Sequence, residues 1–177
     1  SKGIVTIAPY NIEQAQIYCR MIAVKRKMAE SKFLIFQDNP GDGFQPDIFK
    51  SFFWWEDECT QNIQKKFGVS IERRSLQELG QKALTYTDAD AKKMWKSWDY
   101  PVSSGFTEHM ASNAVKLYMA LNDEIDSDLI VGMGTNCLNE SGFCNSTPCL
   151  AWDRLLEERG MLWACEGETV SLATKYM

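Results

Sequence analysis

Histidine is nearly absent from this chain, and long apolar runs and an excess of positive charge are missing as well. The 177 residues contain one histidine, His109, within an expected amphipathic helix, so neither a Ser-His-Asp nor a Cys-His catalytic arrangement is predicted. No apolar run approaches the roughly 20 residues that cross a bilayer, so no membrane partner is expected. A net charge of −5 lacks the basic face that nucleic acid requires, which excludes a nucleic-acid partner.

Export and nucleotide signals are also missing. The opening residues, SKGIVTIAPY, do not show the order of charged, apolar and small residues of a signal peptide. With no such signal, the six cysteines indicate free thiols in a reducing compartment, and we expect a cytoplasmic protein. The segment NPGDG at 39–43 has neither the dinucleotide glycine fingerprint nor the Lys-Ser/Thr of a P-loop, so a plain turn is preferred.

Short apolar runs alternate with longer segments of helical periodicity. This alternation predicts an α/β fold, with a doubly wound parallel sheet of about four strands and helices on both faces, as in Rossmann- and flavodoxin-like proteins. We expect residues 1–165 to form one α/β domain and residues 166–177 to begin a following one. The expected strands lie within 32–37, 69–75, 128–136 and 161–167, and the expected helices within 11–31, 47–68, 75–87, 87–98, 107–125 and 147–160, with a further helix or loop at 169–177.

Several helix ends carry recognisable capping residues. Ser75 stands three residues before Glu78, as in a capping box, and Thr107 follows a glycine at the start of another helical pattern. Pro148 is expected in the first turn of its helix and Gly160 just past its end.

Ligands of open parallel sheets gather at the carboxyl ends of the strands, which directs attention to the segments that follow each run. Carboxylates brought together there suit a hard divalent cation such as Mg²⁺ or Mn²⁺. The alternative is that Glu140 caps a helix starting near Ser146 while the later glutamates are merely solvated, and spacing alone favours this alternative. The segments concerned are Asp38–Gly43, Ser75, Asn136–Ser141 and Glu166–Thr169, with Glu140, Glu166 and Glu168 as the candidate metal ligands.

The cysteines near the same edge raise a zinc hypothesis. Structural zinc sites pair their ligands about two to four residues apart. Cys137, Cys144, Cys149 and Cys165 are separated by six, four and fifteen residues, so buried free thiols are the preferred interpretation. Four aromatic residues at 52–55 predict either core or a subunit interface.

The stretches NCLNES, CLAWDRLLEERG and ACEGETVSLATKYM resemble the L-fucose and L-arabinose isomerase family. The resemblance is strongest from Asp128 to Met177 and extends more loosely upstream through FGVSIERRS to KFLIF. It implies the middle, Rossmann-like domain of such an enzyme and the entry to the C-terminal domain. The resemblance also suggests a homo-oligomer whose sites are completed by neighbouring subunits.

These isomerases interconvert aldose and ketose sugars with a divalent metal, commonly Mn²⁺. The resemblance implies that two acidic residues and a histidine of the C-terminal domain hold the metal, and that proton transfer passes through an enediol-type intermediate. By position, Glu140 matches the first acidic ligand and Glu168 the second, with Glu166 a close rival. Glu140 and Glu168 are thus the expected catalytic residues, acting on a small sugar.

Because the chain stops at Met177, before a histidine-bearing domain, we expect it to be inactive alone. The alternative function is a sugar-binding or regulatory α/β module without catalysis. In that case Trp54, Trp55 or Trp163 would stack on a pyranose ring.

Overall fold

The fold is built on a parallel sheet of four strands. The structure, a computed structural model, describes residues 6–38, 54 and 56–177. The strand order is β2-β1-β3-β4 and every pairing is parallel, which confirms the predicted α/β class. The strands are β1 (Lys32–Phe36), β2 (Ser70–Arg74), β3 (Ile130–Thr135) and β4 (Leu162–Ala164).

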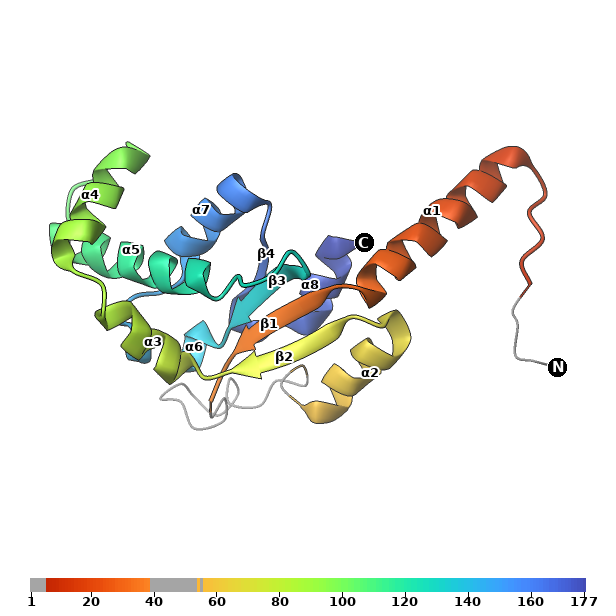
Figure 1. The fold of residues 1–177 in the computed structure, drawn as a ribbon, viewed down its shortest axis with the longest axis horizontal. Helices are drawn as coiled ribbons and strands as arrows, with labels where there is room; N and C mark the ends of the chain where they lie inside the picture. The colour runs from red at the N-terminus through yellow and green to blue at the C-terminus, as the bar shows by residue number, and fades with distance from the viewer. Residues whose placement is uncertain (1–5, 39–53, 55) are drawn as a thin grey trace.

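Helices precede, connect and follow the strands. The α-helices are α1 (Ile12–Ala29), α2 (Asp57–Phe67), α3 (Leu76–Leu84), α4 (Asp88–Trp98), α5 (Glu108–Asp123), α6 (Cys137–Glu140), α7 (Cys149–Arg159) and α8 (Thr169–Tyr176), and the short 3₁₀ helices η4 (Ser141–Cys144) and η5 (Cys165–Gly167) complete the set. In Figure 1, α3, α4, α5 and α7 gather on one side of the sheet.

The buried central strand β1 serves two cores at once, because successive side chains of a strand point to opposite faces. Leu34 and Phe36 pack with residues of α3, α4, α5 and α7. Phe33 and Ile35 pack with residues of α1, α2 and α8 on the other face. A strand that is buried on both faces reads as a continuous apolar run, which is why KFLIF was recognisable in the sequence.

Local capping chemistry fixes several helix ends as predicted. The Ser75 side chain accepts a hydrogen bond from the Glu78 N–H at 3.0 Å, and Thr107 caps α5 in the same way. Gly160 ends α7 with φ of +64°, a left-handed conformation that glycine adopts without strain. Pro148 differs from its prediction, since it occupies the N-cap position of α7 and not the first turn.

The fourth strand is shorter than its apolar pattern suggested. It ends at Ala164, and the next residues form η5 instead of extending the strand to 167. Gly134 of β3 allows this turn to approach, because a Cβ there would lie 2.9 Å from Gly167 Cα. The short helices α6 and η4, which follow β3 directly, were not predicted.

The two ends of the described chain behave differently. In Figure 1, α1 projects away from the sheet, and Met28 is its one buried residue. Lys25 and Arg26 of α1 are exposed. By contrast, α8 packs against the sheet through Leu172 and Ala173.

The proposed domain division at residue 165 stays a prediction. None of the described helices is long and apolar enough to cross a membrane.

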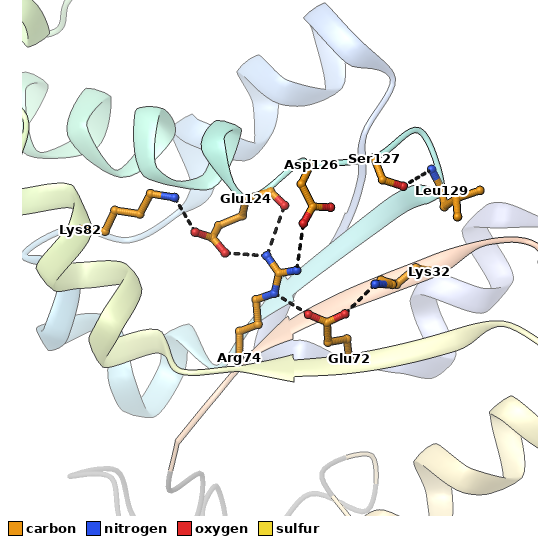
Figure 2. Close-up of polar contacts among 8 residues, drawn as sticks. All are labelled: Lys32, Glu72, Arg74, Lys82, Glu124, Asp126, Ser127 and Leu129. Carbon is orange, nitrogen blue, oxygen red and sulfur yellow. Dashed lines mark hydrogen bonds and ion pairs between the residues drawn. The ribbon is translucent and has the colours of Figure 1, made fainter.

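A polar network ties the end of β2 to the helical layer (Figure 2). Arg74 donates to Glu72 at 2.7 Å and to the Glu124 carboxylate at 2.6 Å. Lys82 of α3 donates to the other Glu124 oxygen at 2.6 Å, while Lys32 of β1 reaches Glu72 at 2.7 Å. The network therefore joins two strands to α3 and the end of α5.

Candidate functional site

The predicted ligands all follow strands whose carboxyl ends lie at one edge of the sheet. The chain runs from β1 outward to β2 and then returns past β1 to β3, so the order reverses between β1 and β3. In open α/β sheets this reversal point is where ligands bind. Asp38 follows β1 and Glu140 follows β3, so these residues flank it.

Glu140 is held across this reversal point. Its side chain is 5% exposed, and both carboxylate oxygens lie 3.1 Å from the backbone N–H of Asp38, which they accept. Asp38 in turn accepts the Gln77 N–H at 2.9 Å, which links it to the start of α3. The alternative that Glu140 caps a helix starting near Ser146 is wrong, because the next long helix begins at Cys149 and has Pro148 at its N-cap.

Glu166 lies in the turn after β4 and reaches back toward the segment after β3. Its Oε2 accepts the backbone N–H of Leu138 at 2.9 Å, and its own backbone carbonyl accepts the Trp54 indole N–H at 3.1 Å. The φ of Glu166 is +56°, a left-handed conformation that costs a non-glycine residue about 1–2 kcal/mol. The fold therefore maintains a strained backbone at the residue whose carboxylate crosses between the two strand ends.

Glu168 has a different local role. Its carboxylate accepts the backbone N–H groups of Val170 and Ser171, both at 2.9 Å, and so caps α8. The hydroxyl of Ser171 also donates to it. Glu168 is thus not merely solvated. Its negative charge reaches Cys59 of α2, where burial raises the thiol pKa and this carboxylate raises it further.

Two cysteines and Glu166 form a close triangle. The Sγ atoms of Cys137 and Cys165 are 3.5 Å apart, and Glu166 Oε1 lies 3.7 Å from the first and 3.4 Å from the second. Burial raises the pKa of both thiols, and the Glu166 charge adds to this effect. Among the described residues this is the one group of three His, Cys, Asp or Glu side chains close enough to hold an ion.

The remaining cysteines divide in a way that spacing did not predict. Cys144 is buried, and burial together with Asp38 and Glu140 raises its pKa to about 12. Cys149 and Cys165 are exposed, so the expectation of buried thiols is wrong for these two, although all six thiols are free.

Asn136 is a further buried polar residue at this edge. It is 0% exposed, and neither atom of its amide has a hydrogen-bond partner in the described part of the chain. Burying an unpaired amide costs on the order of 1–3 kcal/mol, and such groups are rare in folded proteins. The sequence placed Asn136 in a candidate segment but did not single it out.

Two of the three aromatic residues suggested for sugar stacking lie among the described residues, and both have other partners. Trp163 stacks on Trp152 with ring centroids 4.7 Å apart, and Lys175 Nζ lies 4.7 Å from the Trp163 centroid. Trp54 donates its indole N–H to the Glu166 carbonyl, and Trp55 lies outside the described residues, as does most of 52–55. His109 is exposed at the start of α5, where its Nε2 lies 3.2 Å from Asn113 Nδ2.

The structure thus places Glu140, Glu166 and Glu168 at one edge but gives each carboxylate its own backbone N–H donors. No model of a known protein family matches this sequence, and no curated protein matches it either. The metal-ligand role of the three glutamates stays a prediction.

Proposed function

We propose that this chain is part of a metal-dependent aldose–ketose isomerase acting on a fucose- or arabinose-like sugar. The observation that carries the proposal is the buried Glu140 carboxylate, which lies at the reversal point of the sheet and is oriented by the Asp38 N–H. The sequence resemblance independently selects Glu140 and Glu168, which follow adjacent strands of the sheet.

The donor atoms at these positions suit Mn²⁺. Carboxylate oxygens are hard ligands of the kind that Mg²⁺ and Mn²⁺ prefer, whereas thiols favour softer metals. The backbone donors of Glu140 and Glu168 occupy part of the lone-pair capacity of each carboxylate, which has about four acceptor positions. These backbone donors restrict the orientation of both carboxylates, as outer partners of metal ligands do.

In the proposed reaction the chain positions the sugar and moves a proton between neighbouring carbons. A carboxylate at this edge takes the proton from one carbon and returns it to the other, which is general acid–base catalysis. A divalent cation held by these carboxylates would stabilise negative charge that develops on the sugar oxygen. Glu140 and Glu168 are the two groups assigned to these tasks. Loss of a positioned acid–base group lowers the rate by about 10² to 10⁴.

The test is Mn²⁺-dependent interconversion of L-fucose or L-arabinose by the native polypeptide that contains this sequence. We expect Glu140→Gln and Glu168→Gln to abolish ketose formation while far-UV circular dichroism stays unchanged. Glu108→Gln is the matched control, since its carboxylate is largely exposed and pairs only with Lys92 among the described residues. Full turnover in both site variants, or turnover without a divalent metal, would contradict the proposal.

A further inference from the structure

We propose that Cys137, Cys165 and Glu166 form a binding site for a zinc ion, separate from the manganese ligands proposed above. The inference rests on the triangle of Sγ, Sγ and Oε1 atoms and does not require the chain to be an isomerase. Sequence spacing had argued against zinc here, because the two cysteines are far apart along the chain. The fold brings them together.

The dimensions of the triangle match one face of a zinc tetrahedron. With Zn–S of about 2.3 Å and Zn–O of about 2.0–2.2 Å, tetrahedral angles require S–S separations of about 3.8 Å and S–O separations of about 3.6 Å. The corresponding distances are 3.5 Å between the sulfurs, and 3.7 Å and 3.4 Å from Oε1 to Cys137 and Cys165. An ion can therefore contact all three atoms after shifts of a few tenths of an ångström.

The scaffold around the triangle is pre-arranged. Parallel pairing of Gly134 with Ala164 sets the two cysteine-bearing turns side by side just past the strand ends. The second carboxylate oxygen of Glu166 is fixed by the Leu138 N–H at 2.9 Å, as outer-shell donors fix metal ligands. The left-handed backbone of Glu166 is an independent sign, because strained residues of this kind cluster at functional sites.

The chemistry favours zinc over manganese at this position. Two thiolates and one carboxylate together carry three negative charges. The two soft sulfur donors select zinc-like ions, whereas Mn²⁺ prefers oxygen ligands alone. Three protein ligands leave a fourth position for water or another ligand, as in zinc sites that remain open. Cys165 is exposed and Cys137 is buried, so an ion can enter from the Cys165 side.

The experiment is a zinc titration of the reduced protein, in which calorimetry and competition with a chromophoric chelator measure the affinity. We expect one zinc ion per chain, and an affinity loss of about 100-fold or more in Cys137→Ser and in Cys165→Ser, since even outer-shell changes cost 10–100-fold. Cys149→Ser is the matched control, because this exposed thiol lies outside the triangle and should leave affinity unchanged.

Cobalt substitution gives a second readout that does not depend on stability. Co²⁺ should produce a thiolate charge-transfer band that disappears in both site variants, while circular dichroism reports whether each variant folds. Glu166→Gln should weaken binding, whereas Glu140→Gln and Glu168→Gln should leave it intact. Zinc binding can therefore succeed even if the isomerase proposal fails.

Three results would overturn the inference. The first is the absence of stoichiometric zinc binding by the reduced, folded protein. The second is unchanged affinity in the two serine variants. The third is recovery of Cys137 and Cys165 as a disulfide from protein prepared under reducing conditions with zinc, which would make them a redox pair instead.

Discussion

Replacing Gly80 of α3 with alanine should destabilise the protein and disturb Glu140 at the same time. A Cβ built at Gly80 lies 2.1 Å from the carbonyl oxygen of Phe143 and 2.7 Å from its carbonyl carbon. Ordinary contact begins near 3.4 Å, so α3 and η4 would have to separate by roughly 1.3 Å. The opposing atoms belong to the backbone, so no side-chain rotation can relieve this clash.

The expected magnitude follows from two opposing effects. Overpacking a well-filled contact costs about 1–3 kcal/mol and occasionally more. Alanine in a helix interior gains about 1 kcal/mol over glycine. Because the clash is with backbone, the cost should lie at or beyond the upper end of its range, which leaves a net loss of about 2 kcal/mol in the free energy of unfolding. For a chain of this size that lowers Tm by about 4–8 °C.

The consequence for the site comes from chain connectivity. Glu140 is the last residue of α6, and η4 begins at the next residue. A displacement of η4 should therefore weaken the acceptance of the Asp38 N–H by Glu140. Amide hydrogen exchange at Asp38 should become faster in Gly80→Ala, measured alongside urea denaturation.

Gly142→Ala is the matched control within η4 itself. A Cβ at Gly142 meets nothing within 4 Å, and this glycine does not need a left-handed backbone. Its stability should change by less than about 1 kcal/mol, with any gain arising from the unfolded chain. The reasoning is refuted if Gly80→Ala is as stable as the wild type, or if the two variants lose equal stability.

Three further outcomes follow from individual contacts. Burial opposes the ionisation of Glu124, but hydrogen bonds from Lys82 and Arg74 prevail and lower its pKa below the ordinary 4.5. The stability that this carboxylate contributes is therefore fully present above pH 4.5 and is lost as the pH falls through its lower pKa in the folded state. Glu124→Gln should accordingly flatten the dependence of the urea midpoint on acid pH. An unchanged dependence would contradict this explanation. Trp152→Ala should lower the free energy of unfolding by about 3–5 kcal/mol. Trp152→Phe should cost less than about half of that, because the buried indole N–H has no hydrogen-bond partner in the described residues. Equal losses of stability in thermal melts of the two variants would be evidence against this reasoning. Glu168→Ala should remove the cap of α8 and cost about 1 kcal/mol in urea denaturation, while Glu168→Asp retains part of it; equal stability in both variants would exclude the cap.

The parts of the fold that were predictable depend on short-range rules. KFLIF is apolar at every position but its first because both faces of β1 are covered, and this pattern survives in any parallel sheet. Ser75, Thr107 and Gly160 act on backbone groups within four residues, so their effects were visible without tertiary structure. The exposure of most of α1 was not predictable, because apolar periodicity does not say whether a covering surface exists.

The details of the site depended on strand pairing. Cys137 and Cys165 are separated by 28 positions, and they meet because β3 and β4 are adjacent and in register at Gly134 and Ala164. A signal was available, since Cys137 directly follows one expected strand and Cys165 lies near the end of another, but spacing along the chain does not report proximity across the sheet. Likewise, the contact of Glu140 with Asp38 requires β1 and β3 to be neighbours, which only the strand order establishes.

The same geometry separates the two rival glutamates of the proposed manganese site. Glu166 places one carboxylate oxygen between two sulfurs and gives the other to the Leu138 N–H, so binding manganese would require it to leave both. Among the described residues, Glu168 accepts hydrogen bonds from backbone N–H groups and a hydroxyl of α8, which leave oxygen lone pairs for a hard cation. Glu168 is therefore the better candidate partner for Glu140 in the proposed manganese site, and the turn after β4 presents the soft donor Cys165 and the hard donor Glu168 three positions apart. The two proposed sites would therefore not compete for one carboxylate.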